Sequence, residues 1–181
     1  MSVTISTEKP AAGIEAAIQQ AVPETAKKLV IFAWSGELDK IWPTLILATT
    51  SAAMGQDTTV FFTFWGLFPL VKNEKRITGE NWMQKMLSVM NRGGIDHLKL
   101  SKMNFVGAGP AMMHSLAKSH KVASPAELLE MAKEMGVKLV PCQMTMEMMG
   151  LKREDLIDGL EEPAGATTAL LAAQGAATFF I

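Results

Sequence analysis

Short apolar runs, each followed by a helical pattern, constrain the fold of this chain more than any other feature. The runs are residues 28–34 (KLVIFAW), 58–66 (TTVFFTFWG) and 137–141 (VKLVP). None of them alternates polar with apolar residues, so each is predicted to be a strand that is covered on both faces. Strands that alternate with helices favour a parallel sheet with helices on both of its faces.

The boundaries of the other elements follow from caps and breakers. Helices are predicted at residues 35–55, 81–91, 124–136 and 142–150. In the first of these, Pro43 predicts a kink or a late start. Weaker strands are predicted at residues 103–106 and 177–181. We therefore predict a single α/β domain over residues 28–181, flavodoxin-like, with a mostly parallel sheet of about five strands, four to six. Residues 1–27 are predicted to be an N-terminal arm or an extra helix.

Composition excludes several classes of function. The formal net charge is −1 and no block of five like charges occurs, so counterion release on nucleic acid is not expected. The N-terminus lacks the basic start and apolar core of a secretory signal, and every apolar run is shorter than the roughly 18 residues of a membrane span. The sequence thus predicts a cytoplasmic protein without a membrane span.

Cys142 is the only cysteine in a chain that has 14 methionines. A single cysteine cannot form an internal disulfide, which agrees with a reducing compartment, and it excludes C-x-x-C chemistry and a cysteine-rich zinc site. The three histidines, His97, His114 and His120, lack metal-ligand spacing, and His114 is the one to check as an assistant of the thiol. We expect neither a metal nor an organic cofactor.

Two interpretations of Cys142 stand side by side. A free cysteine commonly behaves as a small buried hydrophobe, and the four methionines that follow it at positions 144, 146, 148 and 149 are typical of packing. A thiol at the junction of a strand and a helix, however, meets unpaired N–H groups that favour its thiolate form. The segment 106–111 (VGAGPA) is not a dinucleotide fingerprint, because Met112 occupies the third glycine position, and it is predicted to be a tight turn.

Residues that follow three predicted strands are expected to converge at the carboxyl edge of the sheet. The candidates after the first strand are Ser35, Gly36 and Glu37, and those after the second are Trp65 and Gly66. Cys142 follows the third of these strands directly. Glu37 is predicted to lie near Cys142, either as a helix cap or as a proton acceptor for the thiol.

The motifs SGELDK, TVFFTFWGL, KLSKMNFVGAGPAMM, KLVPCQMTMEMMG and KREDLIDG together resemble the longer, single-chain branch of the DsrE/DsrF-like proteins, from about residue 28 to the C-terminus. The resemblance implies a compact α/β domain, oligomers and sulfur transfer in which Cys142 carries a persulfide. Supporting roles are predicted for Gln143, Met144 and Met146. The implied partners are sulfur donor and acceptor proteins, TusA-like or rhodanese-like.

Rival functions remain at this point. One is an oligomeric binding or assembly module with a structural cysteine, and another is a thiol peroxidase, which would need a resolving thiol from elsewhere. A homo-oligomer is predicted from the apolar content and from the run WGLFPLV, which is expected to lie at a strand end and in a loop that faces solvent.

Overall fold

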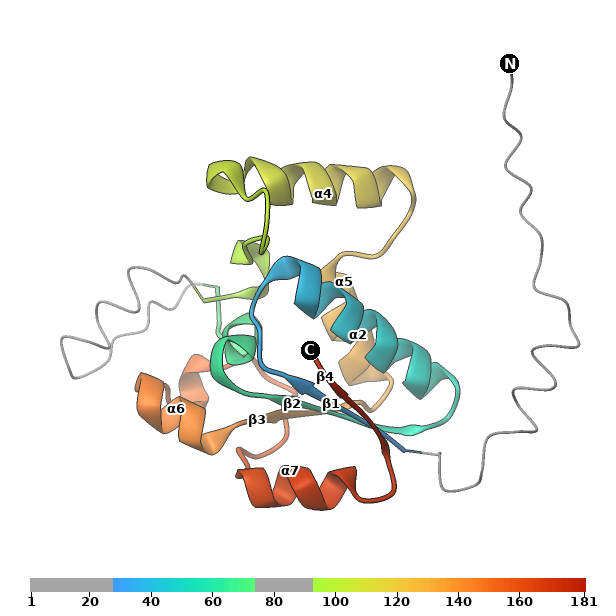
Figure 1. The fold of residues 1–181 in the computed structure, drawn as a ribbon, viewed down its shortest axis with the longest axis vertical. Helices are drawn as coiled ribbons and strands as arrows, with labels where there is room; N and C mark the ends of the chain where they lie inside the picture. Colours follow the sequence, from blue (N-terminus) through green and yellow to red (C-terminus); the bar gives the residue numbers. More distant parts are fainter. Residues whose placement is uncertain (1–27, 74–92) are drawn as a thin grey trace, which may run out of the picture.

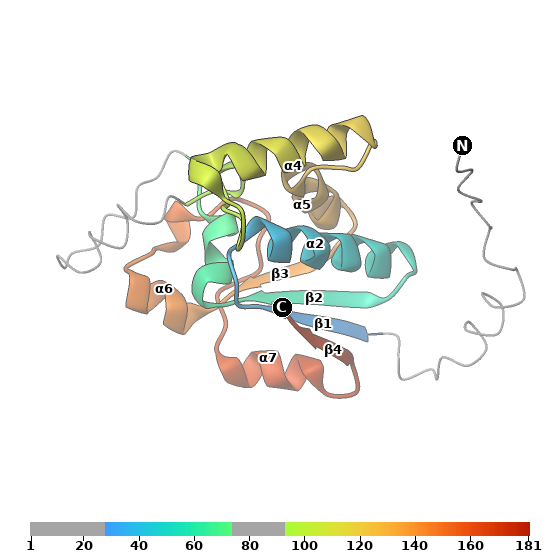
Figure 2. The ribbon, with the colours of Figure 1, turned by 45° about the horizontal axis from the view of Figure 1, so that its top comes forward.

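The computed structural model describes residues 28–73 and 93–181, and these form an α/β domain around one parallel sheet (Figures 1 and 2). The sheet has four strands: β1 (Lys28–Ala33), β2 (Asp57–Phe62), β3 (Lys138–Pro141) and β4 (Ala177–Phe180). Every neighbouring pair is parallel. The predicted fold class is confirmed, with a strand count at the lower end of the expected range.

The strand order is β3-β2-β1-β4. The second and third strands add to one side of β1, and the chain then crosses back to place β4 on the other side. This order differs from the 2-1-3-4-5 order of flavodoxin. Because all four strands are parallel, their carboxyl ends lie at one edge of the sheet. The order places the segments that follow β1, β2 and β3 next to one another at that edge.

The strand expected at residues 103–106 is not formed. A one-turn helix occupies Phe105–Gly107, and Met103, Phe105 and Val106 all have positive φ angles, which a strand does not allow. The Val106 side chain is fully exposed. The segment is apolar, but it packs against no neighbour that could pair with it. The tight turn predicted at residues 106–111 is found only at the start of that segment, where Val106 and Gly107 have positive φ angles, because a helix begins at Ala108.

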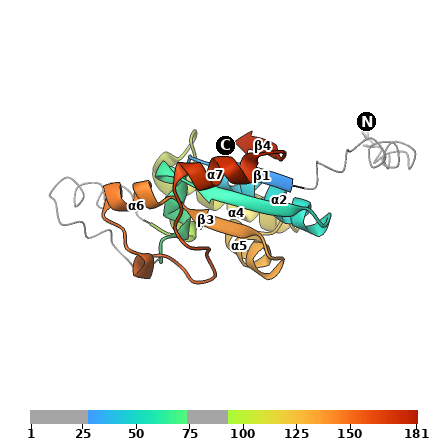
Figure 3. The same ribbon diagram turned by 90° about the horizontal axis from the view of Figure 1, so that it is seen from below.

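Helices cover both faces of the sheet, as predicted. On one face lie α2 (Leu38–Ala53) and α5 (Pro125–Glu134), and on the other lies α7 (Ala166–Ala173), while α4 (Ala108–Ser119) forms an outer layer beyond α2 (Figures 2 and 3). Because side chains alternate along a strand, the main core takes Val60 and Phe62, whereas Phe61 faces α7.

Local sequence signals explain where several helices begin. Ser124 and Glu127 form the reciprocal capping box that opens α5. The helix α2 begins at Leu38 and continues through Pro43, so the late start is not observed. The sequence did not predict α7, because this helix buries only Ala169 and has no apolar stripe to reveal it.

The segment WGLFPLV is not an exposed loop, and that part of the prediction is wrong. Residues Phe64–Leu70 form a 3-10 helix rather than a continuation of β2, and Leu67 and Leu70 are completely buried in the main core. Phe64 and Trp65 at the start of this helix are exposed, and further exposed apolar side chains lie on α4, α7 and β4. The predicted helix at residues 81–91 and the arm at residues 1–27 lie outside the described residues.

Candidate active site at the carboxyl edge of the sheet

The segments beyond the strands are joined in a row by backbone hydrogen bonds. The N–H of Cys142 donates to the carbonyl of Phe62 at 2.9 Å, and the N–H of Thr63 donates to that of Ala33 at 2.9 Å. These bonds continue the sheet past its last strand residues and join the segments that follow β1, β2 and β3 at one edge. They do not by themselves bring the side chains predicted after β1 and β2 to the sulfur of Cys142.

Cys142 stands between β3 and α6 (Gln143–Met149), at the N-cap position of that helix. Its backbone is extended, with φ −75° and ψ 115°, and Gly150 ends the helix in a left-handed conformation, with φ 69°. The predicted junction of strand and helix is thus observed. The side chain of an N-cap residue faces the N–H groups of the next turn, which here belong to α6.

The thiol lies on the face of the sheet that α7 covers. Cys142 is only 3% exposed and packs in a small cluster with Phe61 and Ala169, which the partly buried Val140 and Ala164 adjoin. The N–H of Gln143 donates to the carbonyl of Ala164 at 3.0 Å and fixes the loop before α7 beside the cysteine. A donor molecule can reach the sulfur only when one of these covering groups moves.

The surroundings of the sulfur favour its anionic form. Burial raises the pKa of the Cys142 thiol, but hydrogen bonds from the hydroxyl and N–H of Thr145, the hydroxyl of Thr63 and the N–H of Met144 oppose it. Their combined effect places the pKa below its ordinary value. Burial alone would raise the pKa of a cysteine that served only as apolar filler, so the polar groups beside Cys142 act in the opposite direction.

Thr145 and Thr63 were not among the residues selected from the sequence. Thr145 is 2% exposed, and its Oγ1 lies 3.1 Å from that of Thr63 and accepts the N–H of Phe64 at 3.1 Å. A usable signal was present for Thr145, because the third residue after an N-cap faces the capping side chain. No sequence signal connects Thr63 to Cys142, since the contact depends on the pairing of β2 with β3.

Glu37 is not brought to the thiol. It begins α2, which covers the face opposite α7, and its Oε2 accepts the hydroxyl of Ser35 at 2.5 Å. Its side chain makes no capping hydrogen bond. The capping role is therefore not observed, and Glu37 is no proton acceptor for Cys142, because Glu37 begins a helix on one face of the sheet and Cys142 packs against α7 on the other.

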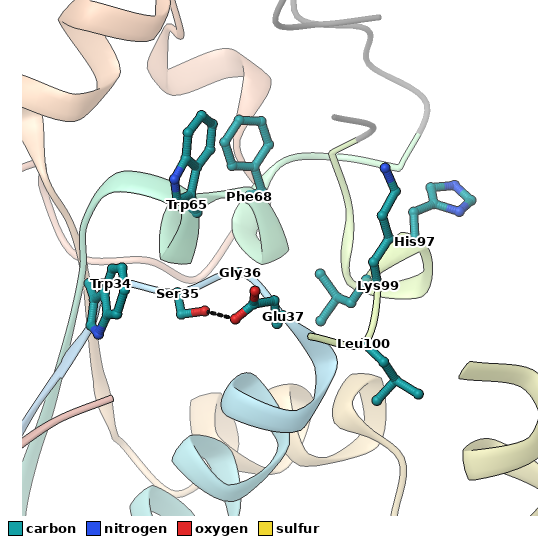
Figure 4. A pocket seen from close by; sticks show the side chains of 10 residues that line it. Trp34, Ser35, Gly36, Glu37, Trp65, Phe68, His97, Lys99 and Leu100 are labelled. Atoms are coloured by element: carbon teal, nitrogen blue, oxygen red, sulfur yellow. Dashed lines mark hydrogen bonds between the residues drawn. The ribbon is translucent and has the colours of Figure 1, made fainter. Parts of the chain in front are cut away.

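Ser35 and Glu37 instead line a cavity of about 460 Å³ that is separate from the cluster around Cys142 (Figure 4). Its walls also include Trp34, Trp65, Phe68 and the segment from His97 to Leu100. Cys142 does not line this cavity. Trp34 stacks on Phe180 of β4 and Trp65 stacks on Phe68, so neither indole belongs to the cluster around the sulfur.

Gly36 and Gly66 allow two loops of this edge to approach closely. A Cβ atom on Gly36 would collide with the carbonyl oxygen of Trp65, and one on Gly66 would collide with that of Ala33. These contacts with backbone atoms explain why both positions are glycine. Their role in the structure is packing of the loops that lead to the site.

The residues of α6 divide between the surface and the core. Gln143 donates to Glu147 at 2.9 Å on the exposed side, and Met144 is also exposed. Met146 is buried in the main core rather than in the cluster around Cys142. Met146 therefore contributes to core packing, as one of the two interpretations expected of these methionines. Met144 affects the sulfur through its backbone N–H and not through its exposed side chain.

His114 lies far from this arrangement in the fold. It is on α4, and its ring is 5.4 Å from that of Trp42 on α2. Among the described residues, no group of three His, Cys, Asp or Glu side chains is placed to hold a metal ion. No helix in residues 28–73 and 93–181 is long and apolar enough to cross a membrane.

Comparison with known proteins gives consistent matches. The model of the DsrE/DsrF/DrsH-like family matches residues 25–180. The uncharacterized protein YrkE of Bacillus subtilis (strain 168) is 39% identical over 158 residues, which cover 87% of this chain and 99% of that protein. The sulfur carrier protein DsrE2 of Allochromatium vinosum is 38% identical over 143 residues, 77% of this chain and 89% of that protein.

A solved structure of similar shape is that of MTH1491 from Methanobacterium thermoautotrophicum, a protein of unknown function. It has a TM-score of 0.45 and 11% sequence identity, and the match covers 85% of this chain and 98% of the other.

Proposed function

Because this chain belongs to the DsrE/DsrF/DrsH-like family, we propose that it is a sulfur carrier that holds sulfane sulfur as a persulfide on Cys142. The observation that carries the proposal is the position of the only thiol in the chain at the N-cap of α6, directly after β3, where neighbouring polar groups lower its pKa. The 38% identity to a protein named as a sulfur carrier supports the same conclusion.

The proposed reaction is an exchange without net oxidation. The Cys142 thiolate attacks the outer sulfur of a donor persulfide, R–S–SH, so that a new S–S bond forms while the donor's own S–S bond breaks. The donor leaves as the thiolate R–S⁻, and the proton stays on the transferred sulfur. An acceptor thiolate then attacks the outer sulfur of the Cys142 persulfide, and Cys142 leaves again as a thiolate.

The partners of this exchange are proposed to be thiol proteins of a sulfur relay, TusA-like or rhodanese-like, and the location is proposed to be cytoplasmic. A lone free cysteine suits a reducing compartment. We also propose a homo-oligomer, because Leu170 and Leu171 of α7 are exposed, as are Phe179 and Phe180 of the edge strand β4. Sedimentation equilibrium at micromolar concentration tests this, and a monodisperse monomer would contradict it.

A transfer assay tests the function. Wild-type protein is treated with polysulfide, freed of excess reagent and mixed with a reduced acceptor protein of the TusA type. Intact mass spectrometry should show the mass of one sulfur atom leaving this chain and appearing on the acceptor. Mass that stays on Cys142 in the presence of several such acceptors would argue against a carrier.

The peroxidase alternative is separated by a second measurement. The chain has no second cysteine, so a reducing thiol is added to resolve any sulfenic acid that forms on Cys142. If Cys142 is a sulfur carrier, turnover of hydrogen peroxide should remain negligible even then. Rapid catalytic turnover of peroxide would favour that alternative.

A further inference from the structure

We propose that the cavity between α7 and the sheet binds a small zwitterionic thiol, of the amino-acid or short-peptide class, whose persulfide donates sulfur to Cys142. Such a donor acts in addition to the protein partners proposed above. The donor role rests on the proposed function, whereas binding in the cavity can be measured without any sulfur transfer.

A cavity of about 390 Å³ lies on the face of the sheet that α7 covers, opposite α2 (Figure 2). Three strands contribute side chains to it, Val30, Thr59 and Val140, and Val30 pairs with Thr59 across the sheet. The helix α7 contributes Thr168 and Ala172. Pockets that hold small organic ligands measure roughly 300–1,000 Å³, so this cavity suits a ligand at the lower end of that range.

Thr59 presents a hydroxyl group that the protein itself leaves without a partner. The residue is 9% exposed, and within residues 28–73 and 93–181 its hydroxyl makes no hydrogen bond. No side-chain nitrogen or oxygen of the described residues is both sealed from solvent and unpaired, so the Thr59 hydroxyl is open to the cavity that it lines. Because a buried hydroxyl without a partner is unfavourable, a ligand that hydrogen-bonds to it is bound more tightly.

The rim of the cavity carries charges of both signs. Lys28 and Lys138 stand at the first positions of β1 and β3, and Lys138 pairs with Asp57 of β2 at 2.7 Å. Glu161 and Glu162, in the segment before α7, add two carboxylates. A ligand of a single charge meets repulsion from part of this rim. A zwitterion can place its carboxylate near the lysines and its ammonium group near the glutamates.

The cavity adjoins the cluster around Cys142. Val140 and Ala164 belong to both, and Val140 lies two residues before Cys142, so the two side chains face the same side of the sheet. Cys142 itself does not line the cavity. A ligand along Val140 also contacts α7, the helix whose Ala169 covers the sulfur, so access to the thiol requires only a local shift of that helix or of the segment at Ala164.

The transfer from the bound donor consumes no oxidant. The Cys142 thiolate forms an S–S bond with the outer sulfur of the donor R–S–SH, and the S–S bond of the donor breaks. The proton stays on the transferred sulfur, and the small thiol leaves the cavity as its thiolate R–S⁻.

Three methyl thioethers test the binding step, because they have no S–H group and no sulfur to transfer. S-Methylcysteine is zwitterionic, 3-(methylthio)propionate has only the carboxylate, and 2-(methylthio)ethylamine has only the ammonium group. Each is titrated into isotopically labelled wild-type protein and followed by NMR chemical shifts. S-Methylcysteine should bind about tenfold more tightly than either analogue, because each analogue loses one charge-assisted hydrogen bond. Equal affinities for the three would contradict a zwitterion site.

Two variants test the cavity. Thr59→Val removes the hydroxyl at nearly constant volume, and it should fold because that hydroxyl has no partner to lose. S-Methylcysteine should bind to it about threefold to tenfold more weakly, the size of one hydrogen bond. Ala172→Leu fills the cavity and should abolish binding.

Thr167→Val and Ala166→Leu are the matched controls, because both positions are exposed on α7 and do not line the cavity. Both should bind S-methylcysteine as the wild type does. Unchanged affinity in folded Thr59→Val, or no binding to the wild type, would overturn the inference. If Thr59→Val does not fold, unchanged affinity in Ala172→Leu would overturn it.

Sulfur loading separates this inference from the proposed function. Cysteine persulfide at a limiting concentration should load one sulfur on wild-type Cys142 and should load Thr59→Val more slowly, as measured by intact mass. Binding of S-methylcysteine without loading by cysteine persulfide or polysulfide would support the binding site and contradict the carrier. Loading by polysulfide without binding of S-methylcysteine would do the reverse.

Discussion

Ala169 of α7 packs against Cys142, and it is the one residue of that helix that the structure buries. The cysteine is therefore covered by a helix with little apolar contact to the sheet. Short helices are stabilised in proteins mainly by the apolar face that they bury. Among the elements around the thiol, α7 is thus the one expected to move when a donor approaches.

A larger side chain at this contact should expose the thiol. Ala169→Leu inserts three carbon atoms into a packed cluster and should lower the free energy of unfolding by about 1–3 kcal/mol. It should also increase the rate at which iodoacetamide alkylates native Cys142, followed by intact mass. The control is Ala166→Leu at an exposed position of the same helix, which should change neither quantity. Equal alkylation rates in the two variants would show that α7 does not limit access.

Serine is expected to replace the cysteine at the N-cap of α6. Serine is among the best N-cap residues, and the N–H groups of Met144 and Thr145 remain available to its oxygen. Cys142→Ser should therefore fold, with a free energy of unfolding about 1 kcal/mol above that of Cys142→Ala. Urea unfolding of both variants measures the difference, and a less stable serine variant would indicate that the site rejects a hydroxyl.

Asp39 at the start of α2 gives a pH-dependent contribution to stability. Slight burial raises the pKa of this carboxyl, but the hydroxyl and N–H of Ser101 donate to it and lower the pKa below its ordinary value. Stability from such a carboxylate is present above its ordinary pKa of about 3.9 and is lost as pH falls through the lower, folded-state value.

Asp39→Asn should therefore destabilise the protein at neutral pH, by less than about 1 kcal/mol because the carboxyl is exposed. The difference from the wild type should shrink in acid. Urea unfolding at both pH values tests this, with Asp158→Asn at another exposed carboxylate as the control. A difference that stays constant from neutral pH into acid would assign the effect to something other than this carboxylate.

The sequence predicted the parts of the fold that depend on local pattern. The buried strands β1, β2 and β3 and the capped helix α5 were recognised because their runs and caps are continuous in the chain. The position of Cys142 at a junction of strand and helix followed from the same reasoning.

The remaining errors concern contacts that no local pattern encodes. Glu37 and Cys142 both follow strands of one parallel sheet, but the sequence does not show that α2 and α7 lie on opposite faces. Thr63 reaches Cys142 only because β2 pairs with β3. The run at residues 65–71 was expected at a strand end and in a loop, although Leu67 and Leu70 fill the core.

Sulfur loading of the single thiol tests the central claim most directly. Wild type and Cys142→Ser are incubated with polysulfide at neutral pH, and the intact mass of each is measured without a reducing agent. We predict that the wild type gains the mass of sulfur and that the serine variant, which has no thiol, gains none. Equal gains in both proteins, or no gain in the folded wild type, would contradict a persulfide carried on Cys142.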